Sequence, residues 1–247
     1  MARLSVNLNK VALLRNARHT GVPDLLHFAR IALDAGAAGL TVHPRPDERH
    51  IRRSDVPALA ALMRPVRPKI EFNIEGYPDA RTQAILEEAR PEQCTFVPDA
   101  PDAFTSDEGW KLGAEQMALA RPAIAAAKAL GCRVILFIDP DPGVVARVRE
   151  AGADGVEIYT GGYAEAFSAG GVTTALLPQI GETAQRAAEL GLLVNAGHDL
   201  NLRNIPPLMG VVPFLAEASI GHELTADALE MGFAAAVRAY AAALRSA

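Results

Sequence analysis

The sequence predicts an α/β protein whose strands close into a (β/α)₈ TIM barrel. Short β-type runs alternate with longer helical patterns, eight strands can be counted, and one helix-to-strand junction recurs in the second half of the chain. Strand–helix alternation indicates parallel strands joined by crossover helices. Eight such units favour a closed barrel over an open sheet.

The expected strands are short apolar runs. They cover Leu4–Leu8, Gly39–Val42, Ile70–Ile74, Cys94–Val97, Val134–Ile138, Gly155–Tyr159, Leu192–Asn195 and Pro213–Ala218. Between them, apolar residues recur at helical spacing. The clearest of these helical segments are Leu25–Ala35, Ala80–Ala89, Glu115–Leu130, Val144–Ala151 and Thr183–Leu190. Each can lay one apolar face on the barrel.

The repeated junction supports this arrangement. AGAAGLTVH at residues 35–43 resembles AGADGVEIY at residues 151–159. In both stretches a glycine ends a helix and the chain turns directly into a strand. No change of composition marks a linker, so we expect one catalytic domain over residues 1–247.

Composition narrows the class of protein. The chain has 247 residues, 50% of them hydrophobic, and a net charge of −5 without a basic stripe, so nucleic acid is not an expected partner. We expect neither a signal peptide nor a membrane span. Cys94 and Cys132 fit buried free thiols rather than a disulfide or metal site, and a cytoplasmic location follows as an expectation.

Strand parity separates side chains that face the helices from those that face the lumen. Ile70, Phe72 and Ile74 should face the helices, which leaves Glu71 and Asn73 in the lumen. The same parity places these further residues inside: Ser5, Asn7, Asn9, Thr41, His43, Glu157, Tyr159, Leu193 and Asn195. Burying an unpaired carboxylate costs several kcal/mol of folding free energy, so Glu71 and Glu157 need either partners or a function. Either a satisfied structural network or a reactive site therefore occupies the barrel.

The histidines favour the reactive site. Four of the six, His43, His50, His198 and His222, fall at or just after the carboxyl ends of expected strands. Active sites of TIM barrels lie at that face. Several proton-transfer groups there predict acid–base chemistry.

Phosphate-binding features lie at the same face. Gly221 precedes the expected last long helix, at the place where barrels commonly bind phosphate on backbone N–H groups, and Gly197-His198 is its neighbour. Arginines after the first two strands could bind anions or could be solvated loop charges. They are Arg15, Arg18, Arg45 and Arg49.

These stretches resemble the pyridoxine 5′-phosphate synthase family. The similarity runs in order through VNLNKVALLRNAR, AGAAGLTVHPRPDERHI, the strand with Glu71, VPDAPDAFTSDEGW, GVEIYTGGYA, LLVNAGHDL and IGH. It implies a (β/α)₈ barrel assembled as a homo-octamer. It also implies condensation of 1-deoxy-D-xylulose 5-phosphate with 3-amino-2-oxopropyl phosphate to give pyridoxine 5′-phosphate, phosphate and water, without a metal or an organic cofactor.

The resemblance also implies site residues. It assigns general bases to His43 and Glu71, a proton donor to His198 and a transition-state-stabilising carboxylate to Glu157. Substrate contacts would come from Asn7, Asn9, Lys10, Arg18, Arg45, His50, Thr105, Asp199, Gly221 and His222.

Four positions, in three places along the chain, depart from the family pattern. Asn9-Lys10 replaces an Asp-His pair, Tyr159 replaces a histidine, and Asp199 replaces a glycine. A carboxylate at position 199 would repel a phosphate, whereas Lys10 would supply compensating charge.

Two other functions are compatible with the same residues. One is a metal-dependent barrel hydrolase with His43, His50, Glu71 and His198 as ligands, although the chain lacks a compact metal-binding motif. The other is a barrel that binds a phosphorylated ligand without catalysis, which the three departures make conceivable.

Overall fold

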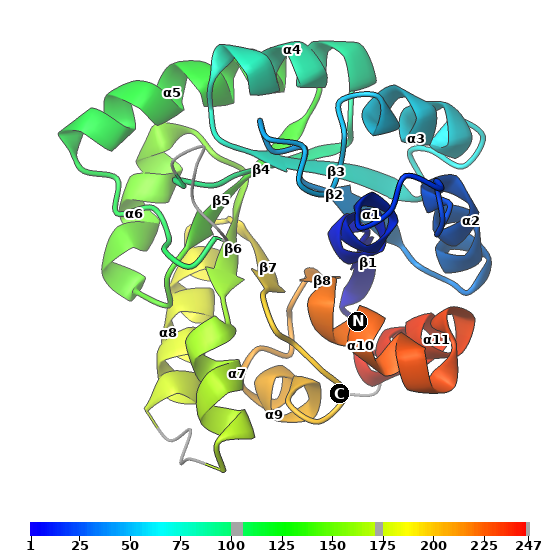
Figure 1. Cartoon of the computed structure of the whole chain (residues 1–247). Coiled ribbons are helices and arrows are strands. Elements are labelled where there is room, and N and C mark those ends of the chain that lie inside the picture. The colour runs from blue at the N-terminus through cyan, green and yellow to red at the C-terminus, as the bar shows by residue number, and fades with distance from the viewer. Residues whose placement is uncertain (100–105, 171–174, 246–247) are drawn as a thin grey trace.

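The structure, a computed structural model, describes residues 1–99, 106–170 and 175–245. Eight parallel strands pair in chain order and close into a barrel, which confirms the expected fold class (Figure 1). The strands are β1 (Arg3–Asn7), β2 (Gly39–Val42), β3 (Glu71–Gly76), β4 (Gln93–Phe96), β5 (Arg133–Ile138), β6 (Gly155–Tyr159), β7 (Leu193–Gly197) and β8 (Glu217–Ile220).

Helices surround the strands (Figure 1). They are α1 (Asn9–Asn16), α2 (Leu25–Asp34), α3 (Asp55–Met63), α4 (Ala80–Ala89), α5 (Ala114–Ala129), α6 (Pro142–Ala151), α7 (Gly161–Ser168), α8 (Leu176–Glu189), α9 (Ile205–Val211), α10 (His222–Met231) and α11 (Phe233–Ala243). Successive outer helices contact one another from α2 to α6, and α11 packs on α2, so the helical layer continues across the chain ends. Within the described residues, no helix has both the length and the apolarity to cross a membrane.

Three helices start almost directly where a strand ends. They are α1 after β1, α7 after β6 and α10 after β8. Their N-termini therefore lie at the carboxyl end of the barrel. The free backbone N–H groups of a helix N-terminus favour anions, so this end of the fold suits negatively charged ligands.

The strand parity is confirmed. Phe72 and Ile74 are fully buried in the apolar layer between strands and helices. In the lumen, the Asn73 amide donates a 3.2 Å hydrogen bond to Thr95. Polar side chains therefore fill a barrel interior that branched apolar residues usually occupy.

The junction repeat is also confirmed. Gly36 and Gly152 have φ of +100° and +92° in the turns after α2 and α6, a left-handed conformation that glycine adopts without steric cost. Cys94 and Cys132 are buried free thiols.

The boundaries of β2 and β6 are as expected, whereas those of β1, β4, β5 and β7 are displaced by one or two residues. β3 and β8 also differ. β3 starts at Glu71 and continues to Gly76, beyond the expected end at Ile74. β8 spans Glu217–Ile220, whereas Pro213–Ala218 was expected. The apolar run before β8 belongs to the turn after α9, where Phe214 is 41% exposed.

Candidate active site

Glu71 does not lie with the histidines. It pairs in register with Gly39, the first residue of β2, so it occupies the amino-terminal end of the barrel, whereas His43 follows the last residue of β2. Arg3 donates a 2.7 Å hydrogen bond to Glu71, and Arg133 forms an ion pair with it. Burial acts to raise the pKa of Glu71, but the two guanidinium groups outweigh burial and leave the pKa lowered. The expected grouping of Glu71 with His43 is therefore wrong.

Glu75 occupies the place that was assigned to Glu71. It has the same lumen parity four residues later, at the carboxyl end of β3. Its Oε2 lies 3.7 Å from Nδ1 of His43 and accepts a 3.4 Å hydrogen bond from the Asn7 amide. The side chains of His43 and Glu75 are only 8% and 13% exposed. The sequence pattern did not point to Glu75, because this strand was expected to end at Ile74, the residue before it.

Burial sets the protonation of this pair. It lowers the pKa of His43 well below its usual range, and Arg45 and His50 lower it further. Burial raises the pKa of Glu75 to about 7, against the opposing charges of Arg45 and His198. At neutral pH the imidazole is therefore uncharged, while the carboxyl group is poised to gain or lose a proton.

Glu157 extends from β6 into the same lumen. It is buried, and Thr95 donates a 3.4 Å hydrogen bond to its Oε2. Burial, followed by the charges of Glu75 and Glu217, raises the pKa of Glu157 well above its usual range. Two coupled buried carboxyls cannot readily both ionise, so burial and its acidic neighbours favour the protonated form of Glu157.

Gly197 at the end of β7 makes room for Glu157. A Cβ atom at position 197 would lie 2.2 Å from Oε1 of Glu157, far inside van der Waals contact. The glycine thus permits the carboxyl group to lie where it does.

His198 follows β7 at the mouth of the barrel. Its Nδ1 lies 3.2 Å from Oδ2 of Asp199, and its ring centroid lies 5.1 Å from that of Tyr159 in an edge-to-face arrangement. Thr160 donates its hydroxyl to the carbonyl oxygens of Gly197 and His198, at 2.7 Å and 2.6 Å. The two residues that depart from the family pattern on this side thus both flank His198.

The loop after β2 carries Arg45 back into the protein. Arg45 is buried, and its Nη2 donates to Asp99 at 3.0 Å and to Ser106 at 3.3 Å. Arg81 donates to the carbonyl oxygens of Pro44 and Arg45, at 2.6 Å and 3.1 Å, and so fixes the loop backbone. A small hollow beside His43 is bordered by these same loop residues.

His50 lies farther along this loop. Burial, then Arg45 and Lys10, lower its pKa to about 4, and its Nδ1 accepts a 2.9 Å hydrogen bond from the Ile51 N–H. Arg15 donates to the His50 carbonyl oxygen at 3.0 Å and binds both carboxylate oxygens of Asp55. Arg15 therefore holds the loop against α1 instead of facing a ligand.

The start of α1 positions His43 from the other side. The Asn9 side-chain oxygen accepts a 2.9 Å hydrogen bond from the His43 N–H, and Asn7 accepts one of 3.0 Å from the Asn9 N–H. Lys10 is half-buried and its charge acts on both His50 and Asp199.

The N-terminus of α10 completes the rim. A Cβ at Gly221 would lie 3.1 Å from Cβ of Asn7, so the two strand ends pack closely there. Thr225, in the first turn of α10, donates its hydroxyl to the Gly221 carbonyl oxygen at 2.8 Å. His222 and Arg18 are exposed. Thr105 lies outside the described residues.

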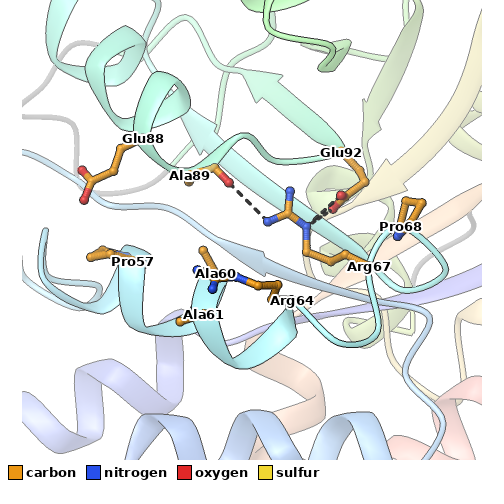
Figure 2. Close-up of a pocket in the computed structure, with 9 residues that line it drawn as sticks. All are labelled: Pro57, Ala60, Ala61, Arg64, Arg67, Pro68, Glu88, Ala89 and Glu92. Atoms are coloured by element: carbon orange, nitrogen blue, oxygen red, sulfur yellow. Dashed lines mark hydrogen bonds and ion pairs between the residues drawn. The ribbon is translucent and has the colours of Figure 1, made fainter.

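A larger cavity, of about 390 Å³, lies outside the barrel between α3 and α4. Figure 2 shows that the Arg67 guanidinium there is directed to Glu92 and to the Ala89 carbonyl oxygen, at 2.7 Å and 3.2 Å. Arg67 and Glu92 therefore bind each other in this cavity, and none of the expected site residues lines it.

The ligands expected for a metal-dependent hydrolase, namely His43, His50, Glu71 and His198, do not all lie together. Glu71 lies at the opposite end of the barrel from His43. Among the described residues, no three His, Cys, Asp or Glu side chains are grouped so that they could hold a metal ion.

Comparison with known proteins identifies the family. The family model described as pyridoxal phosphate biosynthesis protein PdxJ matches residues 4–246. The chain belongs to this family. A pyridoxine 5′-phosphate synthase of Allorhizobium ampelinum is 52% identical over 241 residues, which are 97% of this chain and 96% of that protein. Proteins of the same name from Agrobacterium fabrum and Mesorhizobium japonicum are 51% and 50% identical, covering 97% and 96% of this chain and 96% of each relative.

Solved structures of low identity share the fold. A tryptophan synthase structure from M. tuberculosis matches with a TM-score of 0.67 and 15% identity over 100% of this chain and 93% of that one. The thiamine phosphate pyrophosphorylase of Pyrococcus furiosus matches with a TM-score of 0.60 and 11% identity over 98% and 95%.

Proposed function

We propose that this chain is a pyridoxine 5′-phosphate synthase, which condenses 1-deoxy-D-xylulose 5-phosphate with 3-amino-2-oxopropyl phosphate and releases phosphate and water. One observation carries the proposal. Four titratable groups, His43, Glu75, Glu157 and His198, lie at the carboxyl end of a barrel in a chain of this family, and burial lowers the pKa of His43 while it raises those of Glu75 and Glu157.

The reaction requires such a set. Closing a pyridine ring from two phosphorylated fragments involves imine formation, several proton transfers and the loss of phosphate and water. Each proton transfer needs a group whose pKa suits its direction. Groups in one cavity whose environments push their pKa values apart can divide these tasks.

The protonation states suggest the roles. Neutral His43 and ionised Glu75 act as general bases, since each can accept a proton at neutral pH. Glu157, whose protonated form burial favours, donates a hydrogen bond to an oxygen that gains negative charge in the transition state. His198 donates a proton from the opposite side of the lumen. In this proposal Glu75 takes the role first assigned to Glu71.

The rim residues support phosphate binding. Arg45 and His50 bind the deoxyxylulose phosphate on the β2 side, together with Thr105. The N-terminus of α10, with Gly221 and His222, binds the amino-ketone phosphate. Asn7, Lys10 and Arg18 contribute donors and charge.

The remaining expectations belong to the same proposal. The whole chain acts as one catalytic domain without a metal or an organic cofactor, in the cytoplasm, and as a homo-oligomer, for which the family resemblance implies an octamer. Sedimentation of the purified protein measures that assembly directly.

The experiment that tests the function is product formation. The purified protein is incubated with both substrates after treatment with a chelator, and pyridoxine 5′-phosphate is detected by chromatography and mass spectrometry. We expect product only when both substrates are present. Binding of both phosphates without product would instead show a non-catalytic phospho-ligand barrel.

A further inference from the structure

The imidazole of His198 is held from two sides. Nδ1 lies 3.2 Å from the Asp199 carboxylate, and the ring meets Tyr159 edge to face at 5.1 Å. Tyr159 is in turn packed against Phe137, with centroids 5.6 Å apart. The ring therefore has a carboxylate at one nitrogen and an aromatic wall on its side.

The backbone of this turn is strained and fixed. His198 and Asp199 have φ of +86° and +56°, in the left-handed region that non-glycine residues adopt at a cost of roughly 1–2 kcal/mol each. The Asn204 side chain donates to the Asp199 carbonyl oxygen at 3.0 Å. Glycine would relieve the strain at position 199. A side chain retained there points to a task for the carboxylate.

Charged groups around the turn keep Asp199 ionised. The hydrogen bond with His198 lowers the pKa of Asp199 against the effect of burial, and the charges of His222 and Lys10 lower it further. Glu75 from β3 and Tyr159 from β6 are the other titratable groups that face this region. An ionised carboxylate thus stands beside Nδ1, and the charge of Lys10 acts to offset its repulsion of a phosphate.

We propose that Asp199 is a positioning residue for His198: it accepts the Nδ1–H hydrogen bond and so leaves Nε2 as the atom that delivers a proton to the substrate. The inference rests on the proposed synthase function. When Nε2 gives its proton to a departing substrate oxygen, the electron pair of the carbon–oxygen bond stays with that oxygen. His198 is then neutral and keeps Nδ1–H on Asp199. A carboxylate on the far nitrogen selects this tautomer and stabilises the imidazolium that precedes it.

The first test measures the interaction between Asp199 and His198 in the absence of substrates. The titration of His198 is followed by NMR of ¹⁵N-histidine-labelled protein, with His198→Asn to assign the resonance. Asp199→Asn keeps the shape and tolerates the left-handed backbone, and it should weaken the preference of the neutral His198 ring for the Nδ1–H tautomer and so change its titration. Asp34→Asn, an exposed site at the end of α2, is the matched control and should change nothing. An unchanged His198 titration in Asp199→Asn overturns the proposal.

The second test reads catalysis. Asp199→Asn and Asp199→Gly should lower kcat at least tenfold at high pH and move the alkaline limb of the kcat profile to lower pH, with little change in KM. If these variants instead lower KM for the amino-ketone phosphate and leave the pH profile in place, Asp199 is only a charge near the phosphate and the proposal is wrong. Should the wild-type protein form no product, the synthase function fails, while the NMR titration still decides the Asp199–His198 pair.

Discussion

Nδ1 of His43 lies 3.7 Å from Oε2 of Glu75, and both side chains are almost completely withdrawn from solvent. Burial favours the uncharged form of each, so below about pH 7 the contact joins two neutral groups rather than an ion pair. As the pH rises, Glu75 ionises beside an imidazole that is already neutral. The pair therefore offers two proton acceptors in one place.

This protonation predicts the acidic limb of the pH–rate profile. Because Glu75 must be ionised to accept a proton, kcat/KM should rise as the pH passes through about 7. The limb is measured with both substrates between pH 5.5 and 9, after correction for titration of the substrate phosphates. His50→Gln should leave the limb in place, since His50 titrates near 4. A profile that is flat across this range would contradict the assignment.

The contribution of Glu75 to the free energy of unfolding should fall as the pH rises, whereas kcat/KM should increase. The folded-state pKa of Glu75 is about 7 and its ordinary value is 4.5, so its favourable contribution is complete below about pH 4.5 and is lost as the pH rises through 7. Glu75→Gln should therefore gain stability relative to wild type between pH 5 and 9, by about 2–3 kcal/mol at most. Urea unfolding at both pH values measures this difference.

Glu71→Gln is the matched control for that experiment. The pKa of Glu71 is lowered in the folded protein, so its contribution is present above its unfolded pKa and is lost as the pH falls. This variant should be less stable than wild type at pH 7, by about 1.5–3 kcal/mol, and the difference should shrink in acid. If the stability of both variants relative to wild type changes with pH in the same direction, Glu71 and Glu75 do not have opposite pKa shifts, which would contradict our description.

Gly197→Ala should displace the carboxyl group of Glu157 although Glu157 itself is not replaced. The added Cβ would meet Oε1 of Glu157 at 2.2 Å, so the carboxyl group must move. We expect kcat to fall by about 10²-fold or more, in the range usual for oriented acid–base or hydrogen-bonding groups. Gly210→Ala in α9, where an added Cβ meets nothing within 4 Å, is the control and should retain activity. Full activity of Gly197→Ala would remove Glu157 from the mechanism.

Replacement of His43 and replacement of Arg45 should change different kinetic constants. His43→Gln should mainly lower kcat, because a proton-transfer group acts in the transition state. Arg45→Ala should mainly raise KM for deoxyxylulose phosphate. Since Arg45→Ala also leaves Asp99 without its guanidinium, the double variant Arg45→Ala/Asp99→Asn should recover stability but not KM. The reverse division, with His43 acting on KM alone and Arg45 on kcat alone, would show that the loop was misinterpreted.

Sequence pattern predicted the barrel, most strand positions and the inward parity, but not the level of a side chain along the lumen. Glu71, Asn73 and Glu75 share one parity, so alternation alone cannot choose among them. The level depends on strand length and register, which are set by pairing with β2. One signal was present in the sequence. Glu75 stands four residues after Glu71, just as His43 stands four residues after Gly39, the register partner of Glu71.

The loop after β2 shows a second limit. Its cluster of polar residues correctly indicated a special site, but their partners lie far away in sequence. Arg45 is bound by Asp99 and Ser106, and His50 is held by Arg15 from α1. Sequence spacing gives no information on such contacts. Arg15 was therefore grouped with the anion-binding arginines, although its guanidinium forms an ion pair with Asp55.

The central claim is that Glu75, and not Glu71, is the catalytic carboxyl group of β3 in a pyridoxine 5′-phosphate synthase. The most direct measurement is the rate of pyridoxine 5′-phosphate formation by Glu75→Gln and Glu71→Gln, each at pH 7.5 with both substrates saturating and with folding checked by circular dichroism. We predict that Glu75→Gln lowers the rate by about 10²-fold or more while remaining folded, and that Glu71→Gln keeps most of the wild-type rate. A folded Glu71→Gln that is inactive beside an active Glu75→Gln would contradict the account.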